Sequence, residues 1–205
     1  MNDQYTEEED KLVSWFKDNY KNMVIGIISG GLFVLGYSYI GDKSLNEQYE
    51  MSLMYENAVI SYQEEKYDAV LSLSDELSSS NPSNIYTALI NLYSAKIHHD
   101  NENYDKALNV LKIIIENSNS PEILDIAKLR SARIFIFLQK DDDAKNLILS
   151  IDDYRNKAIP TEILGDIEYY NNNLEEAKKY YSLSLRNNIT PNKRKIIENK
   201  INSIY

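Results

Sequence analysis

The distribution of hydrophobic and polar positions separates one stretch from an otherwise polar chain, "NMVIGIISGGLFVLGYSYIGD" at residues 22–42. No charged residue lies between Lys21 and Asp42, and the run lacks the polar stripe that a core helix of a soluble domain carries. As a helix rising about 1.5 Å per residue, residues 23–41 would extend roughly 28 Å, close to the ~30 Å hydrocarbon core of a bilayer. The pattern therefore predicts a transmembrane helix over residues 23–41.

A removable signal peptide is the alternative, because "GYS" at residues 36–38 loosely fits a cleavage site. The preceding flank favours an uncleaved anchor instead, since it is long and acidic, whereas signal peptides begin with short basic segments. A capping box from Thr6 to Glu9 precedes apolar residues at helical spacing. We therefore expect an amphipathic helix over residues 1–22.

The lysines around the uncharged run predict its orientation. Three lysines precede the run, but only Lys43 lies within the twenty residues after it. Positive charge favours the cytoplasmic side, so we expect residues 1–22 in the cytoplasm and residues 42–205 on the opposite side. Gly26 and Gly30 form a small-xxx-small pair that would let another transmembrane helix approach, although glycine is also simply common in membrane spans.

Residues 42–205 contain an internal repeat. Four stretches align on one small or apolar position, which falls at Val70, Ala107, Ala144 and Ala177. These positions are 37, 37 and 33 residues apart, near the ~34-residue period of a tetratricopeptide repeat. A second small residue lies about twelve positions upstream of each, at Ala58, Ala95, Ala132 and Gly165. Two small positions at that distance indicate a hairpin of two helices whose backbones cross closely.

Turn and cap residues occur in phase with this repeat. "NENY" at residues 101–104 and "NNNL" at residues 171–174 combine turn-forming residues with the first apolar residue of a helix. A cap-type residue before proline marks three repeat ends, at Asn81-Pro82, Ser120-Pro121 and Thr190-Pro191. The acidic run at residues 141–143 predicts a turn followed by a helix N-terminus. A capping helix is predicted at the end of the chain, with Thr190 as N-cap, Pro191 at the first helical position and residues 192–205 following.

The expected fold class is all-α. It consists of a single N-terminal transmembrane helix, followed by an α-solenoid of about four tetratricopeptide-like helical hairpins and a capping helix. The corresponding domains are residues 1–22, residues 23–41 and residues 42–205.

Composition then excludes several kinds of chemistry. The net charge of −10, without a Lys/Arg stripe, argues against nucleic acid, and the absence of cysteine excludes disulfides and thiol catalysis. Beyond the uncharged run Gly165 is the only glycine, so no phosphate-binding loop is present. His98 and His99 are adjacent, point about 100° apart on a helix, and are expected to be surface residues rather than metal ligands. We expect no enzymatic activity, cofactor, metal or small-molecule substrate.

The order of these features resembles a known family. The most telling segments are "KLVSWFKDN" at residues 11–19, "YENAV" at residues 55–59 and the ending "ITP…KINS" between residues 189 and 203. Over essentially its whole length the chain is similar to the ancillary SecYEG translocon subunits of Gram-negative bacteria, the YfgM-type tetratricopeptide family.

This resemblance implies a single-pass protein of the bacterial inner membrane, with a cytoplasmic N-terminus and periplasmic repeats. It also implies two partners besides the lipid bilayer: the SecYEG translocon and a membrane-anchored periplasmic prolyl-isomerase-like chaperone. The family supplies no catalytic residues.

A binding surface is therefore the candidate site. In such solenoids the first helix of each hairpin lines the concave face, and helical spacing along it gives Tyr55, Val59, Tyr62, Lys96, His99, Arg133, Ile136 and Tyr169. Aromatic and aliphatic residues with scattered charges suit an extended or helical peptide, while packing between repeats is the competing explanation for each residue.

The expected function is a membrane-anchored adaptor of the Sec protein-export machinery that links the translocon with periplasmic chaperones. The alternative is a membrane-tethered helical-repeat scaffold for another cell-envelope assembly, such as the division or cell-wall machinery.

Overall fold

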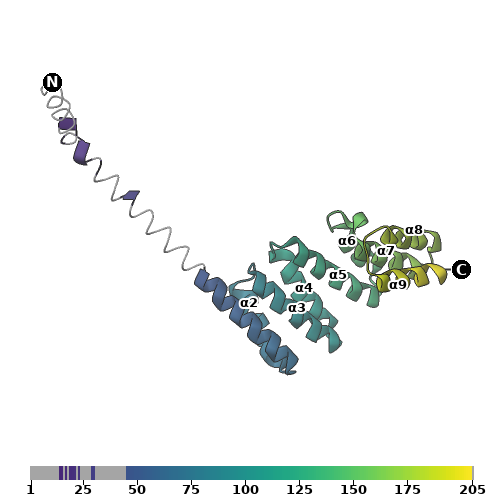
Figure 1. The fold of residues 1–205 in the computed structure, drawn as a ribbon. Helices are drawn as coiled ribbons and strands as arrows, with labels where there is room; N and C mark the ends of the chain where they lie inside the picture. The colour runs from purple at the N-terminus through teal and green to yellow at the C-terminus, as the bar shows by residue number, and fades with distance from the viewer. Residues whose placement is uncertain are drawn as a thin grey trace, which may run out of the picture. The chain divides into compact units, whose positions relative to one another are not determined.

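The structure, a computed structural model, describes residues 45–204 together with residues 14, 15, 17, 19–21, 23, 29 and 30. The chain divides into two units, residues 1–52 and residues 53–205 (Figure 1). In the first unit the described residues are helical, and the Asn19 side-chain amide donates to the Trp15 carbonyl at 2.9 Å.

The predicted membrane span at residues 23–41 lies outside the described residues, apart from helical Met23, Ser29 and Gly30. Gly26 of the predicted glycine pair also lies outside them. In the part of the chain that the structure describes, no helix combines the length and the apolar character needed to cross a membrane. The anchor and its orientation thus stay predictions.

The second unit is built from helices that follow one another along the chain from α2 to α9 (Figure 1). A helix over residues 45–63 precedes them, and residues 45–204 contain no strand. The labelled elements are α2 (Tyr67–Ser80), α3 (Ile85–Asp100), α4 (Tyr104–Asn117), α5 (Pro121–Phe137), α6 (Asp141–Leu149), the 3-10 turn η1 (Tyr154–Asn156), α7 (Ala158–Tyr170), α8 (Leu174–Leu185) and α9 (Pro191–Asn202).

These helices pack as consecutive hairpins. α3 packs on α4, α5 on α6 and α7 on α8, and each second helix contacts the first helix of the next hairpin. The first helices also lie against one another, α3 against α5 and α5 against α7, while α9 packs on α8. The predicted α-solenoid with a terminal capping helix is therefore confirmed within the described residues.

The aligned small residues lie where the helices of a hairpin cross. All four positions of the first set are fully buried: Val70, Ala107, Ala144 and Ala177. The upstream alanines are buried as well, namely Ala58, Ala95 and Ala132. At the fourth upstream position, Gly165 faces the ring of Tyr181. The repeat register predicted from the sequence is confirmed.

Each hairpin turn contains one residue with a left-handed backbone: Glu65, Glu102, Gln139 and Asn172, with φ of 59°, 59°, 58° and 59°. In the second turn the amide of Glu102 donates to the carbonyl of His99 at 2.9 Å, and the amide of Asn103 donates to the carbonyl of His98 at 2.8 Å. The same pair of bonds closes the other three turns. It is the Schellman arrangement, in which glycine is the preferred left-handed residue.

The predicted helix caps are largely confirmed. The side chains of Ser120 and Thr190, each followed by proline, accept the amide three residues on and begin α5 and α9. The acidic run at residues 141–143 forms the first turn of α6. The repeat end predicted at Asn81 is confirmed, because Asn81 ends α2, and Asn84 begins α3 by accepting the Tyr86 amide at 2.9 Å.

An ion-paired network holds α9 against α7. The Lys200 ammonium lies 2.9 Å from Glu162 and 2.7 Å from Asp166, and Lys193 pairs with the other oxygen of Glu162. The Tyr181 hydroxyl donates to Asp166 at 2.8 Å. Burial raises the pKa of Glu162, but hydrogen bonds from the two lysines outweigh it and hold that pKa below its usual value.

Candidate functional site

Four tyrosines gather where the helix over residues 45–63 meets α3. The Tyr93 ring centroid lies 4.9 Å from that of Tyr62 and 6.4 Å from that of Tyr55, and Tyr86 lies 6.0 Å from Tyr55. All four side chains are half-buried, so ring surface faces both the protein and solvent. We call Tyr55, Tyr62, Tyr86 and Tyr93 the tyrosine cluster.

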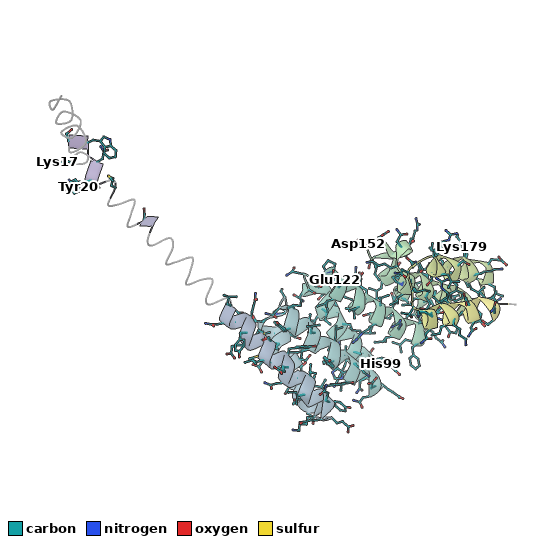
Figure 2. All side chains as sticks on the ribbon, in the orientation of Figure 1. Lys17, Tyr20, His99, Glu122, Asp152 and Lys179 are labelled. Atoms are coloured by element: carbon teal, nitrogen blue, oxygen red, sulfur yellow. The ribbon has the colours of Figure 1, made fainter. Side chains whose placement is uncertain are left out.

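A pocket of about 330 Å³ lies next to this cluster, between α3, α4 and α5. Its lining residues are Ala95, Lys96, His99, Asp100, Leu111, Arg130, Arg133 and Ile134. We call it the cationic pocket, because Lys96, Arg130 and Arg133 outnumber the one carboxylate, Asp100. Figure 2 shows His99 and Glu122 at opposite ends of the hairpins, and the pocket lies at the His99 end.

Asp100 is engaged by residues of its own helix. Lys96 donates to its carboxylate at 2.5 Å, and Nδ1 of His99 lies 3.3 Å away. These contacts, that of Lys96 above all, hold the pKa of Asp100 below its usual value. The pKa of Lys96 is raised, chiefly by its hydrogen bond to Asp100 and also by the nearby hydroxyl of Tyr62. Lys96 therefore joins the tyrosine cluster to the pocket.

The two arginines of the pocket differ in their surroundings. Arg130 is half-buried, and its Nη1 donates to the Leu92 carbonyl at 2.8 Å. Burial lowers the pKa of Arg130, and repulsion from Arg133 adds to this effect. Arg133 is exposed. Among residues 45–204 neither arginine has a carboxylate within ion-pair distance.

Arg133 also lines a second, wider pocket of about 720 Å³ between α5, α6 and α7. Its other lining residues are Ile136, Phe137, Gln139, Asp141, Tyr170 and Asn171. Phe137 is 66% exposed and Tyr170 is 71% exposed, which is unusual for such large rings. The Tyr104 ring lies 4.8 Å from Phe137 and 5.6 Å from His99. We call Tyr104, Phe137, Tyr169 and Tyr170 the aromatic edge.

The structure distributes the predicted groove residues over these three neighbouring features. Tyr55 and Tyr62 lie in the tyrosine cluster, and Lys96, His99 and Arg133 line the cationic pocket. Ile136 lines the wider pocket, and the ring of Tyr169 contacts Tyr170 edge-on at 5.9 Å. Val59 is half-buried and lines neither pocket. A binding role for these residues stays a prediction.

Sequence reasoning missed several residues of the same surface. Tyr93 lies three positions before Lys96, and Arg130 lies three positions before Arg133. Residues three apart share a helix face, so a full reading of that face would have included both. Phe137 lies four positions after Arg133 on the same face, but in the sequence an exposed phenylalanine looks like a core residue.

The side chains of this surface are of kinds that suit binding. Arginine and lysine donate hydrogen bonds to anions, and the tyrosine and phenylalanine rings offer apolar contact area. Within the described ranges no group of His, Asp and Glu side chains is arranged to hold a metal ion.

A family model and several known proteins are similar to this chain. A family model described as a tetratricopeptide repeat-like domain matches residues 13–205. The ancillary SecYEG translocon subunit of Escherichia coli (strain K12) is 24% identical over 203 residues, which cover 98% of each chain. Its counterpart from Aggregatibacter actinomycetemcomitans is 25% identical over 187 residues, 89% of this chain and 91% of the relative.

A third relative of the same name, from Buchnera aphidicola subsp. Schizaphis graminum (strain Sg), is 31% identical over 121 residues, 59% of this chain and 62% of its own. The resemblance inferred from the order of the sequence motifs is thus confirmed. Because the family model covers nearly the full length, the chain belongs to the tetratricopeptide repeat-like domain family.

Proposed function

We propose that this protein is a membrane-anchored adaptor of the Sec protein-export machinery. In this proposal residues 1–22 lie in the cytoplasm, residues 23–41 cross the inner membrane, and the repeats lie in the periplasm. The names of the three relatives support association with the SecYEG translocon. The repeats then link the translocon with periplasmic chaperones, one of them a membrane-anchored prolyl-isomerase-like protein.

The observation that carries the adaptor function is the succession of exposed binding features over neighbouring hairpins. The tyrosine cluster, the cationic pocket and the aromatic edge follow one another, and Lys96 and Arg133 connect them. A surface of this extent fits a partner segment that crosses several repeats, as solenoid grooves do. A membrane anchor would strengthen the association, since confining both partners to one membrane raises their effective concentration without new contacts.

The test is co-purification of the full-length, tagged protein in mild detergent. We expect translocon components and a periplasmic chaperone to be recovered together. Replacing residues 23–41 with an unrelated transmembrane helix separates tethering from a contact through Gly26 and Gly30. Retained association means that tethering suffices, and lost association assigns the contact to the glycine face. Recovery of cell-wall or division proteins without Sec components would contradict the proposal and favour the scaffold alternative.

A further inference from the structure

We propose that the cationic pocket binds the carboxylate side chains of an acidic segment within a partner protein. The segment would run along the groove, with its flanking residues on the tyrosine cluster and the aromatic edge. This inference rests on the proposed function, because it names the chemistry of the segment that the adaptor holds.

The charge of the cationic pocket favours an acidic partner. The chain as a whole carries a net charge of −10, yet the cationic pocket has Lys96, Arg130 and Arg133 against Asp100 alone. Asp100 is already bound by Lys96, so the two arginines have no carboxylate of the described chain to neutralise them. Like charges held side by side repel each other, and a bound anion would relieve that repulsion.

The placement of the two arginines also suits carboxylates. The hydrogen bond from Arg130 to the Leu92 carbonyl holds one guanidinium in place. A held guanidinium loses little conformational freedom when it binds, and its planar fork matches a carboxylate. Arg133 is exposed, three residues further along the same face of α5, and borders both pockets. The pair can therefore receive two carboxylates, or one carboxylate from two directions.

The features on both sides of the pocket favour a carboxylate side chain over a chain terminus. Binding surface continues on both sides of the pocket: Tyr62 contacts Lys96 on one side, and the Tyr104 ring contacts His99 on the other. A chain that ended in the pocket would leave one side unused. An internal Asp or Glu with apolar neighbours on both sides uses all three features. A nucleic acid is disfavoured, because the acidic chain repels a polyanion.

The experiment measures binding of short fluorescent peptides to the full-length protein by anisotropy. The probe has a central pair of glutamates flanked by leucine and tyrosine, and both its ends are blocked so that only side chains are charged. The control peptide has glutamine in place of each glutamate. We expect the glutamate peptide to bind at least about tenfold more tightly, and the difference to shrink as salt screens the charges.

Two charge-reversal variants form a matched pair. Arg133→Glu should remove the preference for glutamate over glutamine, whereas Arg186→Glu, at an exposed position beyond the end of α8, should keep it. Arg130→Lys keeps the charge but loses the fork and should weaken the preference partly. Circular dichroism of each variant checks that the helices are intact.

Three results would overturn the inference: equal binding of the two peptides, equal loss of preference in both charge-reversal variants, or displacement by inorganic phosphate with no difference between the peptides. The last result would assign the pocket to a phosphate group instead. None of them depends on co-purification with the translocon, so failure of this inference is distinguishable from failure of the proposed function.

Discussion

Gly165 lies so close to the Tyr181 ring that a Cβ atom on it would be 2.5 Å from Cδ1 and Cε1. The backbone of α7 therefore packs directly on an aromatic side chain of α8. Gly165→Ala should lower the free energy of unfolding, because overpacking costs about 1–3 kcal/mol while alanine returns at most about 1 kcal/mol of helix propensity. Urea unfolding followed by circular dichroism measures the change in the free energy of unfolding.

Changing the partner tests whether the ring is the cause. Tyr181→Leu should therefore lower the free energy of unfolding less in the Gly165→Ala background than in the natural chain. Tyr181→Phe keeps the ring and removes only the hydrogen bond to Asp166, so it should give no recovery. Identical effects of Tyr181→Leu in both backgrounds would show that the two positions are not in strained contact.

The buried alanines of the repeat register give a second prediction. Ala107 and Ala144 are fully buried where hairpin helices cross. Ala→Leu at either position should destabilise the protein by about 1–3 kcal/mol through overpacking. Ala69 is exposed on α2, so Ala69→Leu is the matched control and should change the melting temperature little. Equal melting temperatures for all three variants would contradict the crossing geometry.

A third prediction concerns the left-handed turn residues. Glu102 has φ of 59°, a conformation that costs a non-glycine residue roughly 1–2 kcal/mol. Glu102→Gly should therefore stabilise the protein by about 0.4–1 kcal/mol after the greater freedom of glycine in the unfolded chain is counted. Asn172→Gly should stabilise less, because asparagine tolerates this conformation better.

The control uses the same substitution in a helix. Glu198 is exposed in the interior of α9, where glycine should lower stability by about 0.5–1 kcal/mol. Opposite signs for Glu102→Gly and Glu198→Gly are the expected outcome in thermal melts. The same sign for both would mean that backbone conformation does not govern the effect.

A fourth prediction follows from the ion pairs of Glu162. Its pKa is below the ordinary value of 4.5 because Lys193 and Lys200 outweigh the effect of burial. A carboxyl with a lowered pKa contributes stability above its unfolded-state pKa and loses that contribution as the pH falls through the folded-state pKa. The unfolding free energy should therefore decline as the pH falls below about 4.5.

Removing both lysines should reverse this contribution. With Lys193→Met and Lys200→Met, burial alone acts on Glu162 and raises its pKa, so protonation of Glu162 then favours the folded state. The variant should be destabilised near neutral pH by about 3–5 kcal/mol, and its deficit should narrow as the pH falls. Urea titrations from pH 7 to pH 3 measure this, and a deficit independent of pH would exclude Glu162 as its source.

The last prediction concerns topology. A reporter that is active only in the periplasm, fused after Tyr205, should be active, and the protein should retain its N-terminus. Mass spectrometry of the mature protein checks the second point. A mature chain that begins at Tyr39 would overturn the anchor in favour of a cleaved signal peptide.

The repeat architecture was predictable because its signals are local and recur. Small residues such as Ala107 and Ala144 recur at the same buried position of successive hairpins, and the caps at Ser120 and Thr190 depend only on the next three residues. The repeat end at Asn81 was predicted in the same way, whereas the N-cap of α3 at Asn84 was not identified from the sequence.

The candidate site was predictable only in part. Helical spacing gave Tyr62, Lys96 and Arg133, which lie on the expected face. The role of Arg130 depends on the Leu92 carbonyl 38 residues away, and no spacing rule connects those two positions. No spacing rule connects Lys200 with Glu162 either, because these two residues are also 38 residues apart.

The neighbour-to-neighbour packing of the hairpins also has a consequence for how such a protein can evolve. In a fold of this kind stability is approximately a sum of local contributions from adjacent repeats. The tyrosine cluster and the cationic pocket lie on the helix over residues 45–63 and on α3, α4 and α5, whereas the ion-paired closure joins α7 to α9. Mutations in the tyrosine cluster and the cationic pocket therefore leave the closure of the far end intact, so the proposed recognition surface can change over evolution without restabilising the fold.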